Sequence, residues 1–149
     1  MQQSRQEVLI ADDDRQLIDM LRIRCLDIGL AVQVSSDALQ ALVKAHQRLP
    51  ALVILDISMP SGNGLGVCEM MAADNRLRHI PVIILTGDSK SKTQERVKAL
   101  GAHYVMKSSD IWVRLEPVIC DLLSIDPAAV RYRKRIEDGR REKRKNQAG

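Results

Sequence analysis

Six polar side chains follow short aliphatic runs of this sequence, and their types suit metal and phosphate chemistry. They are Asp12, Asp13 and Asp14 after Val8–Ala11, Asp56 after Leu52–Leu55, Thr86 after Val82–Leu85, and Lys107 after Tyr104–Met106. If the carboxylates meet in the fold, they repel one another and must take up protons or bind a cation. Hard oxygen ligands select Mg²⁺ or Ca²⁺, and a site with few protein ligands favours Mg²⁺, which commonly joins carboxylates to a phosphate.

A cation site built from carboxylates can also support phosphoryl transfer. A carboxylate beside the metal can attack a phosphoryl group and form an aspartyl phosphate. The three equatorial oxygens of that group need positive charge and hydrogen-bond donors, which the metal, Lys107 and Thr86 would supply. The set of residues therefore suggests a protein that accepts a phosphoryl group.

The aliphatic runs predict the strands that would position these side chains. Their lack of polar alternation is typical of strands covered on both faces, as in a parallel sheet. The five runs are Val8–Ala11, Ala31–Val34, Leu52–Leu55, Val82–Leu85 and Tyr104–Met106. Segments of three-four helical spacing alternate with them, which predicts an α/β fold with right-handed crossovers. Because the carboxyl ends of parallel strands form one edge of the sheet, the polar side chains are expected at one rim.

The composition narrows the class of protein. The 149 residues suit one domain, and the 2% aromatic content predicts an aliphatic core. Cys25, Cys68 and Cys120 are widely spaced and have no companion ligands, which argues against a disulfide framework or a zinc site. No signal-peptide pattern or membrane-spanning run is present, so a cytoplasmic location is expected.

The C-terminal residues differ in charge from the rest of the chain. Residues 131–149 hold nine Lys or Arg against three Asp or Glu, whereas residues 1–130 hold fourteen against sixteen. A mildly acidic body therefore carries a basic tail. Asp126 followed by Pro127 is a helix-start signal, and we expect a helix to about Arg135 with fraying beyond Gly139.

Four motifs occur in order along the chain: Leu9–Asp14, Val53–Pro60, Ile84–Gly87 and Tyr104–Lys107. Together they resemble the receiver domain of bacterial two-component response regulators. The resemblance covers about residues 6–124 and implies a flavodoxin-like, doubly wound five-stranded parallel sheet in the order 2-1-3-4-5. Residues 125–149 would form a basic, helical C-terminal tail or linker.

The resemblance also implies a role for each candidate site residue. Carried over by position, the roles are Asp56 as phosphoacceptor; Asp12, Asp13, Asp56 and the Ser58 backbone carbonyl as Mg²⁺ ligands; Thr86 and Lys107 as contacts of the phosphoryl group; and Thr86 and Tyr104 as the switch pair. Asp14 is expected to cap the following helix, and the turn-rich segment Met59–Gly64 is expected to hold Asp56 in place. The chain has Ser108 where the family usually has a cis proline.

The implied partners are a sensor histidine kinase or phosphotransfer protein, a downstream protein on the face of the family's fourth helix and fifth strand, and, as an option, a second copy. No enzymatic activity is expected beyond autophosphorylation and autodephosphorylation. The main alternative is a phosphorylation-independent interaction module with the same fold. A haloacid-dehalogenase-type phosphatase would need Asp at position 58, where this chain has Ser58. Nucleic-acid or membrane contact through the basic tail remains open, although no helix-turn-helix pattern accompanies it.

Overall fold

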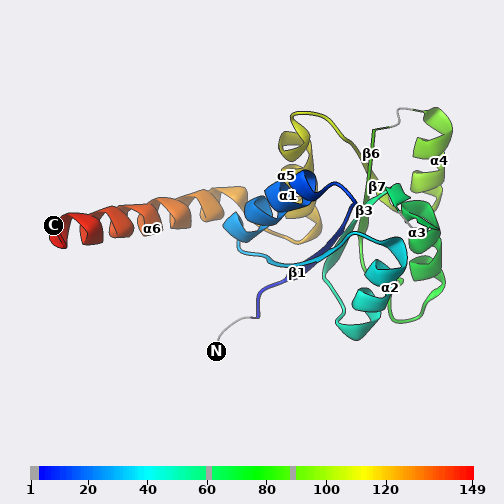
Figure 1. Cartoon of the computed structure of the whole chain (residues 1–149), viewed down its shortest axis with the longest axis horizontal. Helices are drawn as coiled ribbons and strands as arrows, with labels where there is room; N and C mark the ends of the chain where they lie inside the picture. The colour runs from blue at the N-terminus through cyan, green and yellow to red at the C-terminus, as the bar shows by residue number, and fades with distance from the viewer. Residues whose placement is uncertain (1–3, 60–61, 88–89) are drawn as a thin grey trace.

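The computed structural model in Figure 1 describes residues 4–59, 62–87 and 90–149, so Pro60 of the second motif lies outside the described residues. A five-stranded parallel sheet forms its centre, in the order β2-β1-β3-β6-β7. The strands are β1 (Glu7–Ala11), β2 (Ala31–Ser35), β3 (Leu52–Asp56), β6 (Val82–Thr86) and β7 (His103–Met106). This order confirms the predicted 2-1-3-4-5 sheet. Each strand is one residue longer than predicted, so Asp56 and Thr86 are themselves the last residues of strands.

Helices cover both faces of the sheet. They are α1 (Arg15–Asp27), α2 (Ala38–Gln47), α3 (Gly64–Ala73), α4 (Ser91–Ala99) and α5 (Ile111–Leu122). One aliphatic cluster joins α1 and α5 to the sheet, and a second joins α2, α3 and α4 to the opposite face. Along β1, Val8 and Ile10 enter the first cluster while Leu9 and Ala11 enter the second, as the period of two in a strand requires. Burial on both faces explains the absence of polar alternation in the strands.

One feature between the main elements is missing from the sequence-based prediction. A short antiparallel hairpin, β4 (Ser58–Met59) and β5 (Gly62–Asn63), lies between β3 and α3 and is not evident from the hydrophobic pattern. Among the described residues no peptide bond is cis, so the link from Lys107 to Ser108 is trans. Pro117 lies inside α5 and leaves the helix continuous.

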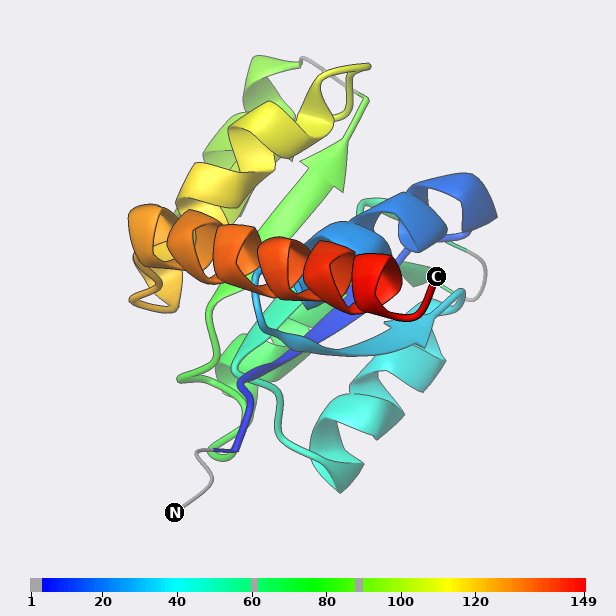
Figure 2. The ribbon, with the colours of Figure 1, turned by 90° about the vertical axis from the view of Figure 1, so that its left-hand side faces the viewer.

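The C-terminal helix α6 (Pro127–Gln147) is longer than predicted. The Asp126 side chain caps its start by accepting a hydrogen bond from the Ala128 N–H at 2.9 Å, as expected. The expected fraying beyond Gly139 is absent, because Gly139 costs about 1 kcal/mol and the flanking Arg, Lys, Glu and Gln residues are good helix formers. Figure 2 shows α6 in front of the face that carries α1 and α5. Among the described residues, no helix is both long and apolar enough to cross a bilayer.

Candidate functional site

The first two carboxylates of the candidate site lie where β1 ends and α1 begins. Asp12 is fully buried, and its backbone N–H donates to the Ser35 carbonyl at 3.0 Å, which ties it to the neighbouring β2. Asp13 is exposed. Asp14 caps α1 by accepting from the Leu17 N–H at 3.2 Å, as predicted. The short link from strand to helix thus buries one carboxylate and leaves the next at the surface.

Asp56, Thr86 and Lys107 come from the three neighbouring strand ends. Asp56 ends β3 and Thr86 ends β6, and both are buried. Lys107 directly follows β7, and its backbone N–H donates to the Thr86 carbonyl at 2.8 Å. This bond continues the β6–β7 pairing by one residue and directs the lysine side chain to the same edge of the sheet as the carboxylates.

The Lys107 ammonium group lies between two carboxylates. Its Nζ is 2.7 Å from Asp12 Oδ2 and 3.2 Å from Asp56 Oδ1. Asp12 Oδ2 is nevertheless buried without a well-oriented hydrogen bond from any described residue, so its contact with Lys107 is an ion pair of poor hydrogen-bond geometry. One cation thus partly neutralises two buried acids.

The electrostatic consequences are opposite for the acid and the base. Burial raises the pKa of the Asp56 carboxyl above its ordinary value, and the negative charge of Asp12 raises it further; Lys107 and the Ser58 backbone N–H lower it without reversing the shift. Burial would lower the pKa of the Lys107 ammonium, but its close contacts with Asp12 and Asp56 outweigh burial and raise that pKa. Lys107 therefore remains charged, and Asp56 is costly to ionise until further positive charge arrives.

The carboxylate cluster, which we define as Asp12, Asp13 and Asp56, has the donor set of a divalent-cation site. One ligand oxygen from each of the three residues lies within 4.8 Å of the others. Oxygen donors at this spacing suit Mg²⁺, which keeps several waters and takes only a few protein ligands. The buried Asp12 Oδ2 and the raised pKa of Asp56 are the two observations that a bound cation would resolve. The residues therefore fit the metal.

A cavity of about 530 Å³ opens beside the cluster. It is lined by Asp13, Asp56, Ile57, Ser58, Asn63, Leu65, Thr86, Gly87 and Lys107. The structure thus brings five candidate residues of the sequence analysis to one cavity. Asp12 does not line the cavity but forms an ion pair with Lys107, which does. Tyr104 is not among the lining residues; it is half-buried and packs against the core cluster shared by α2, α3 and α4.

Two residues beside Asp56 have positions that sequence reasoning did not assign individually. Asn63 caps α3 by accepting from the Gly66 N–H at 2.7 Å, a pattern that an Asn before a helical segment indicates. At Gly64, an added Cβ would lie 2.2 Å from the Asp56 carbonyl oxygen. The Gly64 N–H also donates to the Ile57 carbonyl at 3.0 Å. Only glycine allows α3 to begin this close to the end of β3.

Residues 8–112 match the family described as the response regulator receiver domain. The chain belongs to this family. Its curated relatives include the DNA-binding response regulator MtrA of Mycobacterium tuberculosis, which is 37% identical over 110 residues, 72% of this chain and 46% of that protein. The DNA-binding dual master transcriptional regulator RpaA of Synechocystis is 28% identical over 137 residues, 89% of this chain and 56% of that protein. This receiver domain chain thus spans about half the length of the curated relatives it matches.

Solved structures resemble the receiver domain as well. The signal receiver domain of a signal transduction histidine kinase from Syntrophus aciditrophicus has a TM-score of 0.73 at 28% identity, covering 80% of this chain and 90% of that one. The phosphorylated cyanobacterial phytochrome response regulator RcpA has a TM-score of 0.73 at 18% identity, covering 83% and 97%. The second likeness shows the fold alone.

Proposed function

We propose that this receiver domain accepts a phosphoryl group on Asp56 from a histidine kinase or phosphotransfer protein. The observation that carries the proposal is the cluster of Asp12, Asp13 and Asp56 beside an open cavity, in which the Lys107 ammonium group contacts Asp12 and Asp56. The cavity admits a phosphodonor, and Asp56 is one of its lining residues. A pure scaffold with this fold would need neither the buried charges nor their neutralisation.

In the proposed reaction, an Asp56 oxygen attacks phosphorus while the bond from phosphorus to the donor breaks. With a phosphohistidine donor, the broken bond is phosphorus–nitrogen and the leaving imidazole takes up a proton. Asp12, Asp13, Asp56 and the Ser58 carbonyl would hold Mg²⁺, which neutralises phosphoryl charge when bound. Lys107 supplies a further positive charge, and the Thr86 hydroxyl supplies a hydrogen bond at the cavity wall.

The proposed switch begins at Thr86. A phosphoryl group on Asp56 would draw the Thr86 hydroxyl toward it, and Tyr104 would change its packing in response. Thr86 and Tyr104 lie on the adjacent strands β6 and β7, in a sheet register that pairs Thr86 with Met106 and Ile84 with Tyr104. The outer face of α4 and β7 would then receive a downstream protein or a second copy. We place the protein in the cytoplasm, with no enzymatic activity beyond its own phosphorylation and dephosphorylation.

Intact-mass measurement after incubation with acetyl phosphate tests the proposal. Wild type should gain one phosphate only when Mg²⁺ is present, and Asp56→Asn should gain none. The matched control is Asp14→Asn, because Asp14 caps α1 and is not part of the carboxylate cluster; it should still gain phosphate. Equal incorporation by wild type and Asp56→Asn would refute the assignment. No incorporation by a folded wild type, from acetyl phosphate or from phosphorylated histidine kinases, would favour the phosphorylation-independent interaction module.

A further inference from the structure

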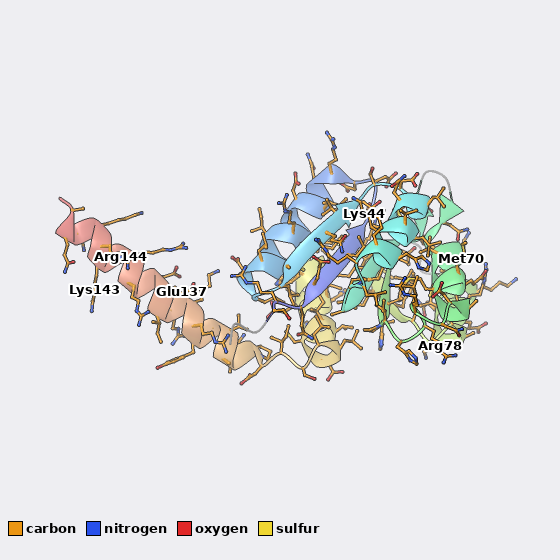
Figure 3. All side chains as sticks on the ribbon, turned by 90° about the horizontal axis from the view of Figure 1, so that it is seen from below. Lys44, Met70, Arg78, Glu137, Lys143 and Arg144 are labelled. Carbon is orange, nitrogen blue, oxygen red and sulfur yellow. The ribbon has the colours of Figure 1, made fainter. Side chains whose placement is uncertain are left out.

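The helix α6 presents a dense positive charge to solvent. All nine Lys and Arg of residues 131–149 lie within it, together with three acidic residues, and it contains no buried residue. The large apolar side chains exposed on it are Tyr132 and Ile136. Figure 3 shows its charged side chains projecting from the helix, with Lys143 and Arg144 on the part that extends beyond the body.

Only the first part of α6 meets the body. A groove of about 870 Å³ separates it from the end of α1 and the residues before β1, and the last α6 residue lining the groove is Arg141. The ion pair that bridges the groove joins Lys134 Nζ to Asp27 Oδ2 at 3.3 Å, between exposed side chains. The α6 residues beyond Arg141 do not line this groove and are therefore accessible to a partner.

The cations beyond Gly139 do not form a single face. At about 100° per residue, Arg141 and Lys143 lie about 200° apart around the helix axis, and Lys145 lies about 140° from Arg140. A flat partner surface meets only one side of such a helix. A groove with negative charge on both walls contacts every side of an inserted helix except the side that faces out of the groove.

We propose that α6 inserts into the major groove of a B-form DNA duplex and binds it without sequence preference. The major groove is about 12 Å wide, and an α-helix with its side chains is about 10–12 Å across. The six residues of α6 beyond Arg141, which do not line the groove against the body, span about 9 Å. Phosphates on both walls would then pair with the arginines and lysines, and release of counterions would drive binding.

Other polyanionic or helical partners fit this helix less well. Insertion into a membrane surface needs a wide apolar face, and α6 offers two exposed large apolar side chains. Parallel pairing with a second copy along the seam Ala129, Tyr132, Ile136 would place Arg135 of one copy beside Arg140 of the other. The major groove of duplex RNA is too narrow for a helix. B-form DNA is the partner that can pair with the cations beyond Gly139 on more than one side of the helix.

Fluorescence anisotropy of the full chain with a mixed-sequence DNA duplex of about 20 base pairs tests this proposal. At about 50 mM salt, wild type should bind with a micromolar Kd, and log Kd should rise with log salt with a slope of about 4–5, for about five neutralised phosphates. The triple variant Lys143→Glu, Arg144→Glu, Lys145→Glu should bind about 30-fold more weakly and lose about 3 from that slope. The control Arg76→Glu, Arg78→Glu alters charges between α3 and β6 and should bind within about twofold of wild type. Figure 3 shows Arg78 at the end of the molecule opposite to Lys143 and Arg144.

A charge-neutral variant separates helix insertion from simple charge attraction. Gly139→Pro should break α6, because proline removes a backbone hydrogen bond and clashes with the preceding turn of the helix, and it should weaken DNA binding about tenfold. Wild type should bind equally with and without acetyl phosphate and Mg²⁺, because α6 acts here without phosphorylation. Absence of DNA binding by wild type, unchanged binding by the triple variant or by Gly139→Pro, or equal or tighter binding to duplex RNA or to phosphatidylcholine vesicles with 30% phosphatidylserine would each overturn the proposal.

Discussion

At the sheet edge, one lysine and three carboxylates meet within a few ångströms, whereas along α6 nine cations spread over 21 residues of exposed helix. The first group is positioned by the ends of three strands, β1, β3 and β7, and its Asp12 and Asp56 are buried. The second is positioned by helix propensity and one cap. Because burial removes water, each charge at the sheet edge depends on its neighbour, while each charge on α6 is screened and acts nearly independently. Substitutions should therefore have large, position-specific effects in the first region and small, additive ones in the second.

The largest expected effect is at the backbone contact that holds Asp56. Gly64→Ala would place a methyl group 2.2 Å from the Asp56 carbonyl oxygen, so α3 and the end of β3 must separate, at a cost of about 3 kcal/mol in the free energy of unfolding. Urea unfolding at equilibrium measures it. The control is Gly66→Ala in the same helix, whose methyl group would lie at an ordinary 3.5 Å from Asn63 Oδ1 and which should be neutral or slightly stabilising. A Gly64→Ala protein as stable as wild type would contradict the packing described above.

Removing the ammonium group comes next. Lys107→Met leaves Asp12 and Asp56 facing each other without a counter-ion and should destabilise the metal-free protein by about 2 kcal/mol, less than for a fully buried pair because Lys107 is partly exposed. Thermal melts in EDTA and in Mg²⁺ measure it, and Mg²⁺ should restore more stability to the variant than to wild type. The control is Lys98→Met on α4, an exposed lysine, which should change the melting temperature little in either buffer. An equal Mg²⁺ effect on Lys107→Met and wild type would show that the ammonium group and the metal do not share these carboxylates.

The pH dependence of stability tests the same charges with a smaller effect. The folded state holds the Asp56 proton to a higher pH than the unfolded chain, whose aspartates have a pKa of about 3.9. Between these two values the folded state binds more protons, so this group makes stability fall as pH rises through its raised folded pKa. In metal-free urea titrations, Asp56→Asn should remove that fall and be the more stable protein at neutral pH. A variant with the same pH profile as wild type would show that the Asp56 charge is not strained.

The smallest effect is expected from the tail. Deleting residues 127–149 removes a helix with no buried residue and one exposed ion pair, worth about 0–1 kcal/mol. The unfolding free energy should change by less than about 1 kcal/mol, and Asp56 should still take up phosphate. Urea unfolding and intact mass measure the two. Loss of phosphorylation in a truncated protein that remains folded would show that α6 belongs to the switch, and the contrast between the two regions would fail.

Local signals account for what the sequence predicted well. From Val8 onward β1 is an aliphatic run, and so are β3 and β6 up to their last residues, because both faces of the sheet are covered; Asp12, Asp56 and Thr86 stand at or directly after the ends of these runs. Asp14 and Asp126 predict the starts of α1 and α6, because a capping side chain accepts a hydrogen bond from a backbone N–H group only two or three residues away. The predicted end of α6 near Arg135 is too early. Gly139 costs the helix only about 1 kcal/mol, and the good helix formers around it offset that cost.

The amino-acid sequence by itself determined the five strands of the main sheet, the helices between them and the shared edge at which Asp12, Asp56, Thr86 and Lys107 emerge. These follow from periodicity, helix caps and the common direction of parallel strands, whereas the order of the strands came from the resemblance to the receiver family. Only the tertiary structure decided that Lys107 bridges Asp12 and Asp56, that Tyr104 packs against the core cluster of α2, α3 and α4, and that Gly64 contacts the Asp56 backbone. Such relations join residues that are 8 to 95 positions apart in the sequence. They are set by the packing of several elements at once, which no local pattern of residues encodes.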